Sequence, residues 1–266
     1  MIVFITGISS GFGYETAKLL SQEGHAVYGT VRREVEPLPN VHYFKLDVRD
    51  SESVKKAVDE IVEKECRIDV LVNNAGMGIG GPLEFATEEE IRLQMDTNFM
   101  GLVHCVDAVL PHMRQQGNGK IIALSSIGGL MGLPFQGFYS ASKFAIEGYC
   151  EALRLEVKQQ GIKVIVLRPG DFATSFTGSR KKVNDASALE AYPIYKTAIE
   201  KVEHDENCGL NPTVLAHKIS QIIQKKNPRN GYVVASFEQK LSVLLKRILP
   251  AKWFAQILGS YYKIAS

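Results

Sequence analysis

Three side chains with complementary chemistry lie close together in the middle of the sequence: Ser126, Tyr139 and Lys143. Because Tyr139 and Lys143 have the spacing of one helical turn, a helix would place the phenol and the ammonium on one face. A nearby cation favours phenolate, which would bring the pKa of Tyr139 down toward neutral pH and allow proton transfer. Ser126 could hydrogen-bond a carbonyl oxygen and stabilise developing negative charge. The trio predicts chemistry at a carbonyl or an alcohol.

A glycine-rich turn follows the first apolar run of the chain. Glycines let a backbone approach a pyrophosphate closely, and the amides at the start of a helix favour an anion. The spacing is GxxxGxG, not the GxGxxG of the standard dinucleotide fingerprint. Its position between a strand and a helix still predicts a site for a phosphate-bearing cofactor. The residues expected to contact it are Gly7, Ser9, Ser10, Gly11, Phe12 and Gly13.

Short β-branched runs alternate with segments of helical periodicity. The expected strands are residues 2–6, 26–31, 41–46, 70–73, 120–125, 163–167 and 232–235. The expected helices are residues 13–22, 53–64, 88–109, 141–159 and 212–225. Apolar strands separated by helices indicate a parallel sheet covered on both faces. We therefore expect an α/β fold, a doubly wound parallel sheet of about seven strands whose ligands bind at the carboxyl ends of the strands.

Composition narrows the class of protein. The chain has 266 residues and is 45% hydrophobic, so we expect one domain over residues 1–266. A net charge of +2 and the lack of interleaved aromatic and basic residues argue against nucleic-acid binding. The four cysteines have no metal-ligand spacing and suggest reduced thiols. With no secretory leader and no apolar run approaching the ~18 residues that cross a bilayer, we expect a cytoplasmic protein without a metal site.

Two segments interrupt the alternating pattern. Residues 171–210 are polar and include Arg180-Lys181-Lys182, and loops of this length are commonly lids, so we expect a substrate lid with short helices. Residues 236–266 form a C-terminal extension, basic and amphipathic over 240–263 and broken by Pro250. The extension could complete the substrate pocket, pack on a partner subunit or touch a membrane surface. We prefer packing, because amphipathic stretches usually face a core.

The chain resembles the short-chain dehydrogenase/reductase family. The resemblance covers residues 2 to about 174 and rests on motifs in the family's order: Thr6-Gly7-x-x-x-Gly11-x-Gly13, Asn73-Asn74-Ala75-Gly76, Asn98, Ser126, Tyr139-x-x-x-Lys143 and Pro169-Gly170. Residues 209–266 look similar to the branch that contains hydroxysteroid and retinol dehydrogenases. The resemblance implies a Rossmann-like fold, a nicotinamide cofactor, and a homodimer or homotetramer formed through the helices after Asn98 and Tyr139.

The resemblance also implies the catalytic roles. Tyr139 would be the proton donor and acceptor, and Lys143 would tune its pKa and bind the nicotinamide ribose. Ser126 would polarise the carbonyl, and Asn98 would hold a water relay from the lysine to solvent. Taken alone, Asn98 indicates a local helix distortion.

Further cofactor contacts are implied in the same way. Asp47 and Val48 would contact the adenine ring, although Asp47 could equally be the N-cap of the next helix. Asn74, Ala75 and Gly76 would lie against the adenosine ribose, with Asn73 structural. The residues expected near the nicotinamide are Pro169, Gly170, Phe172 and Thr174.

The end of the second expected strand bears on the choice of cofactor. A fold that prefers NAD places an acid there, about 20 residues after the glycines, to bond the ribose 2′-hydroxyl. Here Val31 takes that position and Arg32 and Arg33 follow. A guanidinium pairs well with a 2′-phosphate. We therefore expect NADP(H) in preference to NAD(H), with Arg32 the stronger candidate and Ser9 a helper; the alternative is that both arginines are solvated loop charges.

Apolar residues surround the expected reactive centre: Met77, Leu130, Met131, Leu133, Phe135, Phe138, Phe172 and Phe176. We expect about half of them to line a pocket for a hydrophobic ketone, aldehyde or secondary alcohol. The function predicted is an NADP-dependent carbonyl reductase or alcohol dehydrogenase. A non-catalytic NADP-sensing regulator is the alternative, although such proteins usually lose the tyrosine or the lysine. A sugar epimerase or dehydratase would show GxxGxxG spacing.

Overall fold

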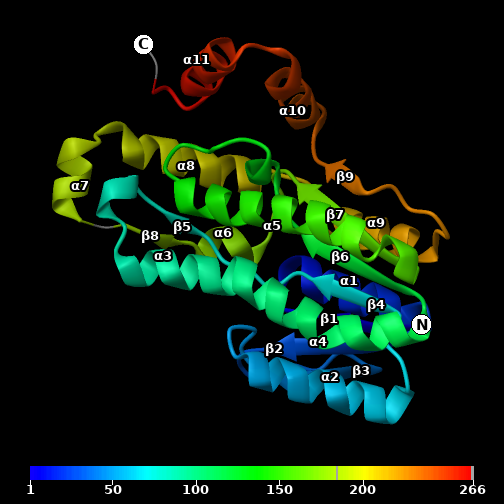
Figure 1. Cartoon of the computed structure of the whole chain (residues 1–266). Helices are drawn as coiled ribbons and strands as arrows, with labels where there is room; N and C mark the ends of the chain where they lie inside the picture. The colour runs from blue at the N-terminus through cyan, green and yellow to red at the C-terminus, as the bar shows by residue number, and fades with distance from the viewer. Residues whose placement is uncertain (184, 265–266) are drawn as a thin grey trace.

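The computed structural model describes residues 1–183 and 185–264 and is built around one seven-stranded parallel sheet (Figure 1). The order across the sheet is β3-β2-β1-β4-β6-β7-β9. The strands are β1 (Ile2–Ile5), β2 (Ala26–Val31), β3 (Val41–Lys45), β4 (Val70–Asn73), β6 (Gly119–Leu124), β7 (Ile162–Pro169) and β9 (Gly231–Val234). The chain winds one way from β1 to β3 and the other way from β4 onward, which confirms the predicted doubly wound, Rossmann-like α/β fold.

Helices cover both faces of the sheet. One face carries α1 (Gly11–Gln22) and α9 (Pro212–Gln224), and the other carries α2 (Ser51–Glu65), α4 (Gly101–Gln116) and α5 (Gly137–Glu156). The alternation of side chains along a strand separates the two cores. In β1, Val3 and Ile5 pack under α1 and α9, and Phe4 between them packs on the opposite side. Apolar side chains are buried on both faces of the sheet, as the continuous apolar strands predict.

The helix expected over residues 88–109 is interrupted. It consists of α3 (Glu88–Met95), a π-helical turn (Asp96–Met100) and then α4. A capping box between Thr87 and Glu90 begins α3. The π-helical turn contains the buried Asn98, which agrees with the local distortion expected there. Such turns are frequent at functional sites.

Short elements follow β7 in the segment expected to be a lid. They are α6 (Ser175–Ser179), β8 (Lys181–Lys182), α7 (Ala186–Ala191) and the longer α8 (Ile194–Asn207). β8 pairs with β5 (Ile79–Gly80) in a separate small sheet, which the sequence did not predict because two-residue strands carry no periodicity. The remaining short elements are the 3-10 turns Leu83–Phe85, Ile127–Gly129 and Lys158–Gln160.

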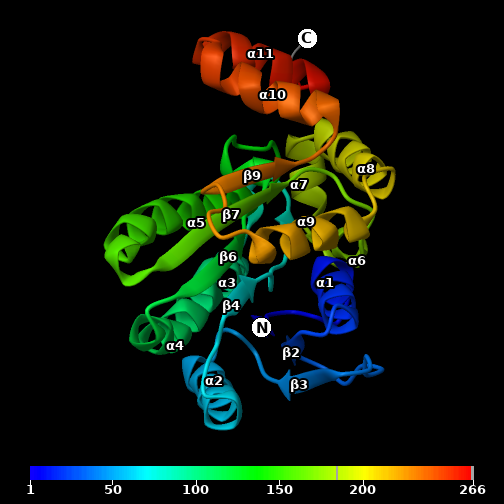
Figure 2. The ribbon, with the colours of Figure 1, turned by 90° about the vertical axis from the view of Figure 1, so that its right-hand side faces the viewer.

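The C-terminal extension is a helical hairpin at one end of the molecule, seen at the top of Figure 2. It comprises α10 (Phe237–Ile248) and α11 (Ala251–Tyr261), with the break at Pro250 as expected. Helix α10 buries no side chain and α11 buries only Phe254. The preferred expectation, packing of an amphipathic face on the core, is therefore not met by α10. Over the described residues, no helix combines the length and apolar character needed to cross a membrane.

Candidate active site

A cavity of about 1060 Å³ lies at the carboxyl ends of the parallel strands. Its walls include Ser126, Tyr139 and Lys143 together with every residue expected to contact the cofactor except Gly13. Asn98 does not line the cavity. Of the eight apolar residues considered from the sequence, Met131, Leu133, Phe172 and Phe176 form part of the wall. The expectation that about half would do so is confirmed.

The glycine turn forms a cradle at the start of α1. Gly7 and Gly11 have φ of 72° and 58°, a conformation that side chains disfavour. The N-cap residue Ser10 makes no side-chain capping bond, so no cap side chain satisfies the first amides of α1. A Cβ on Gly7 would lie 3.0 Å from Cα of Ala75. Free amides at a helix N-terminus beside a close-packed backbone fit the pyrophosphate of a dinucleotide.

Gly13 has a packing role in the structure. A Cβ built on it would lie 2.2 Å from the Gly7 carbonyl oxygen and 2.5 Å from Nδ2 of Asn74. The third glycine thus lets α1 sit directly on the turn that precedes it. Its predicted contact with the cofactor has no counterpart in the cavity wall.

We expect Gly13→Ala to destabilise the protein, because the new methyl group would collide with the backbone carbonyl of Gly7 as well as with the Asn74 side chain. Overpacking of this kind costs about 1–3 kcal/mol in free energy of unfolding. Denaturant unfolding followed by circular dichroism would measure it. Gly148→Ala is a matched control in α5, where no atom lies within 4 Å of the added Cβ. It should be neutral or stabilising by up to about 1 kcal/mol. Equal stability of the two variants would contradict the packing role of Gly13.

Asn74 holds the turn in place through its side chain. Its Nδ2 donates to the carbonyl oxygens of Thr6 (2.9 Å) and Gly7 (2.8 Å). The Thr6 hydroxyl accepts from the backbone amides of Asn74 and Ala75. The Asn73 side chain is buried, and its amide atoms have no hydrogen-bond partner within the described part of the chain. Asn74 lines the cavity as expected and is also the asparagine whose side chain ties neighbouring segments together, a role that the sequence analysis gave to Asn73.

The end of the cavity next to β2 contains two exposed arginines. Val31 is buried as the last residue of β2, and Arg32 and Arg33 follow it at the cavity wall. Asp47 also lines this end, but its carboxylate is bound by Arg49 Nη2 (2.7 Å) and Nε, and this bond lowers its pKa. The N-cap of α2 is Asp50, so the alternative reading of Asp47 as that cap is wrong.

Tyr139 lies in the first turn of α5, beside Ser126 at the end of β6. The pKa of the phenol is raised to about 12, and burial is the largest cause. A hydrogen bond with Ser126 lowers this pKa, and the Glu206 carboxylate raises it. Arg180 lowers this pKa and Asp171 raises it. The phenol is therefore fully protonated near neutral pH, which is the form that can donate a proton to a carbonyl oxygen.

Lys143 is buried one turn further along α5. Its Nζ donates to the Leu124 carbonyl oxygen (2.8 Å) and lies 5.7 Å from the centroid of the Tyr139 ring. Burial lowers the pKa of the ammonium to about 8. The expectation that Lys143 brings the pKa of Tyr139 below its usual value is not met, since burial and the nearby carboxylates act in the opposite direction.

Asn98 positions the loop behind the lysine. Its Oδ1 accepts from the Met77 amide (2.8 Å), and its Nδ2 donates to the Met77 carbonyl and to Ser142 Oγ (both 3.0 Å). A Cβ on Gly76 would approach both Asn98 Oδ1 (3.3 Å) and Lys143 Nζ (3.8 Å), so both side chains lie next to this glycine. Both Nδ2 protons are thus used in holding Met77 and Ser142, while Oδ1 can accept a second hydrogen bond. The water relay at Asn98 stays a prediction.

The chain after β7 forms the part of the cavity wall where the nicotinamide is expected. Phe172 packs its ring edge against Phe12 at a centroid distance of 4.8 Å, so the two cofactor segments touch. The Thr174 hydroxyl accepts from the Phe176 amide as the N-cap of α6. A Cβ on Gly170 would lie 2.7 Å from Cβ of Ala235 and 2.0 Å from Oε1 of Gln239, so this glycine is closely packed. These contacts hold the predicted residues in the cavity wall.

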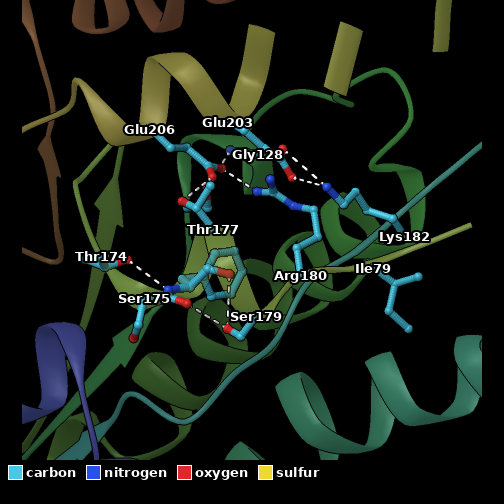
Figure 3. A network of polar contacts seen from close by, with 12 residues as sticks. Ile79, Gly128, Thr174, Ser175, Thr177, Ser179, Arg180, Lys182, Glu203 and Glu206 are labelled. Carbon is cyan, nitrogen blue, oxygen red and sulfur yellow. Dashed lines mark hydrogen bonds and ion pairs between the residues drawn. The ribbon is translucent and has the colours of Figure 1, made fainter. Parts of the chain in front are cut away.

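Four carboxylates that the sequence analysis did not assign to the site also line the cavity: Asp171, Asp205, Glu206 and the exposed Glu238. Asp205 is paired with Lys201 at 2.9 Å. Glu206 is paired with the buried Arg180 and accepts from the Thr177 hydroxyl at 2.7 Å (Figure 3). The lone acid directly after Pro169-Gly170, at the carboxyl end of a central strand, is the signal that could have identified Asp171.

Asp171 has no cationic partner within the described residues. Its pKa is raised to about 6 by burial first and then by the charges of Glu206 and Asp205, with Gln239 and Arg180 acting in the opposite direction. Asp171 is thus a half-buried carboxylate that no basic side chain neutralises, and its charge raises the pKa of Tyr139.

Together, the fold and the cavity define a nucleotide-binding α/β protein in which Ser126, Tyr139 and Lys143 line one cavity. The family described as short chain dehydrogenase matches residues 1–185. The chain therefore belongs to the short-chain dehydrogenase/reductase family of oxidoreductases, and the predicted family is confirmed.

Known proteins support this assignment over the full length. The chain is 48% identical to 3-ketodihydrosphingosine reductase of Bacteroides thetaiotaomicron, over 99% of this chain and 98% of that protein. It is 33% identical to human 17-beta-hydroxysteroid dehydrogenase type 1, over 93% and 80% of the two chains. The crystal structure of a short-chain dehydrogenase from Streptomyces avermitilis superposes with a TM-score of 0.81 at 27% identity, over 99% and 98% of the chains.

Solved structures of this fold hold nicotinamide cofactors of both kinds. A short chain dehydrogenase/reductase from Burkholderia phymatum in complex with NAD has a TM-score of 0.76 at 23% identity, over 86% and 88% of the chains. ElxO with NADP bound has a TM-score of 0.69 at 26% identity, over 87% and 95% of the chains. The predicted nicotinamide cofactor is supported, and the preference for NADP(H) stays a prediction.

Proposed function

We propose that this protein is an NADP(H)-dependent reductase of a long-chain ketone that carries an amino group beside the carbonyl. The observation that carries this proposal is the cavity itself, in which a protonated phenol, a serine hydroxyl and an unpaired carboxylate face one apolar space. The Bacteroides relative is named as a 3-ketodihydrosphingosine reductase, and that ketone has this chemistry. The alternative of a non-catalytic NADP sensor gains no support from the site, since both Tyr139 and Lys143 are in place.

The cofactor would lie along the glycine turn. The α1 amides would hold its pyrophosphate, and Arg32, with Arg33 beside it, would bind a 2′-phosphate. Lys143 and the segment around Phe172 would hold the nicotinamide end. When bound, the reduced nicotinamide supplies hydride to the carbonyl carbon.

The protein residues would provide the proton and the electrostatic stabilisation. Tyr139 donates its proton to the carbonyl oxygen while Ser126 hydrogen-bonds that oxygen and stabilises the developing alkoxide. A raised pKa keeps the phenol in its acid form, and a cationic substrate group near Asp171 would offset the negative charge that raises it. Asn98 acts by holding Met77 and Ser142 around the lysine.

Asp171 would bind the substrate ammonium. A partly buried carboxylate without a cation is costly, and a ligand that supplies the cation recovers this cost on binding. The apolar wall that includes Met131, Leu133 and Phe176 would hold the alkyl chain.

We propose further that residues 171–210 act as the lid over this substrate and that the whole chain is one domain. We propose too that copies pair through α4 and α5, where Phe144 and Leu155 are exposed apolar side chains.

We expect the wild-type protein to oxidise NADPH faster with a long-chain 2-amino ketone than with the same ketone lacking the amine. Asp171→Asn should lower kcat/KM for the amino ketone about 10- to 100-fold, the value of a hydrogen bond to a charged group, and leave the neutral ketone nearly unaffected. Because Asp171 loses its charge as pH falls through about 6, KM for the amino ketone should rise below that pH in the wild type only. The decrease of NADPH fluorescence with time measures the rate for each protein with each ketone and at each pH.

Asp107→Asn, the same change at an exposed site on α4, is the matched control and should leave the substrate preference intact. Equal use of both ketones by the wild type would refute ammonium recognition by Asp171. Failure to reduce either ketone, with NADPH still bound, would instead refute the proposed substrate class.

A further inference from the structure

The hairpin of α10 and α11 exposes an apolar surface that no other part of the described chain covers. Of the fifteen large apolar side chains exposed among residues 1–183 and 185–264, eight lie within residues 237–264. Phe237 is 75% exposed, Ile248 65% and Trp253 60%. Concentrated apolar exposure of this kind marks an interaction site.

These side chains form one stripe on each helix. Successive members are three or four residues apart, the spacing of a single helical face. The α10 stripe is Phe237, Leu241, Leu244 and Ile248. The α11 stripe is Trp253, Ile257 and Tyr261. Such a face usually packs on a core, but α10 buries no side chain at all. The stripes are therefore available to a partner outside the chain.

The hairpin is also strongly basic. Residues 237–264 contain five basic side chains and one acid, Glu238, which gives +4 in a chain whose net charge is +2. The basic residues are Lys240, Lys246, Arg247, Lys252 and Lys263. None of the five forms an ion pair in the part of the chain that the structure describes. The positive charge is thus concentrated beside the apolar stripes.

The same hairpin forms a wall of the cavity. Gln239 and Ser242 of α10 and Phe254 and Leu258 of α11 line the cavity on its inner side. Ile257 belongs both to the exposed stripe and to the cavity wall, as does Tyr261. The outer apolar surface is therefore continuous with the space that contains the reactive phenol.

We propose that the α10–α11 hairpin docks on an anionic lipid surface. The two apolar stripes would enter the interface, and the basic side chains would lie among the headgroups. An apolar substrate could then pass from the lipid along Ile257 and Tyr261 into the cavity. That last step rests on the proposed function, whereas docking itself does not.

A second copy of the chain is a less suitable occupant of this surface. A two-fold dimer brings the same patch of both subunits together, which would place two hairpins of +4 charge face to face. Like charges across an interface oppose association, whereas anionic headgroups complement them. The lone tryptophan of the chain, Trp253, stands in the stripe and reports on its environment.

The test is flotation of the full-length protein with vesicles of phosphatidylcholine alone or mixed with phosphatidylglycerol, together with Trp253 emission. We expect binding to the anionic vesicles, a blue shift of the emission, and weaker binding as salt is added. The double variant Leu244→Glu with Ile248→Glu should lose at least about tenfold in vesicle partitioning. The control Val214→Glu, at a 43% exposed site on α9, should bind like the wild type.

Two results would overturn the proposal. The first is no binding to anionic vesicles at low salt. The second is a wild-type dimer that the double variant converts to monomer in light scattering, with vesicle binding unchanged by the substitutions. NADPH binding by each variant shows that it is folded. Because no substrate is present, failure of the proposed reduction would leave this test intact.

Discussion

Tyr139→Phe should reduce kcat for ketone reduction by about 10²- to 10⁴-fold, the usual contribution of a positioned general acid. The substitution removes only the hydroxyl that would give its proton to the substrate oxygen. The ring contact with Phe176, at 5.8 Å between centroids, would remain. Since Lys143 and the glycine turn are untouched, NADPH should bind with nearly unchanged affinity. Steady-state rates and a fluorescence titration with NADPH measure the two effects separately.

Tyr149→Phe is the matched control for this prediction, because Tyr149 lies on the same helix but outside the cavity wall. It should keep its turnover. Retained activity in Tyr139→Phe would remove the proton-donor role from the phenol. A wild-type protein that binds NADPH but turns over no carbonyl compound would favour the alternative of a cofactor sensor.

The fold could be predicted from the sequence because its signals are local and repeated. All seven strands of the main sheet were placed within a few residues, since each is a short apolar run next to an amphipathic helix. The positions of the candidate site residues followed from the same pattern, because Ser126 lies just after β6 and the Pro169-Gly170 pair lies at the end of β7.

Features that depend on the packing of distant segments could not be predicted. Helix α8 brings Glu206 and Asp205 near Asp171, and their charges raise its pKa. Glu206 and Asp205 are themselves paired with Arg180 and Lys201, whereas Asp171 is left without a cation among the described residues. The phenol pKa follows burial and these carboxylates more than the spacing to Lys143. Arg180 begins a run of three basic residues in the sequence, and the fold buries it against Glu206 (Figure 3). Sequence spacing identifies which groups meet, while their ionisation depends on the whole environment.

Arg32→Ala should weaken NADPH binding by about 10- to 100-fold and leave NADH binding nearly unchanged. Arg32 lies at the cavity wall directly after β2 and forms no ion pair among the described residues, so its guanidinium is available for a 2′-phosphate. Removal of that partner should affect only the cofactor that carries the phosphate. Parallel titrations of wild type and variant with both cofactors, at fixed ionic strength, measure the difference.

Arg33→Ala is the matched variant that separates a specific contact of Arg32 from a general effect of positive charge on NADPH affinity. Both arginines are exposed and line the same end of the cavity, so a general effect of positive charge would lower NADPH affinity in both variants equally. A specific contact should make the loss larger for Arg32. Weaker binding of both cofactors in Arg32→Ala would assign the arginine to a part of the dinucleotide that NAD and NADP share. Tighter binding of NADH than NADPH by the wild type would contradict the preference itself, because Val31 leaves no acid at the end of β2 to bind the ribose hydroxyls.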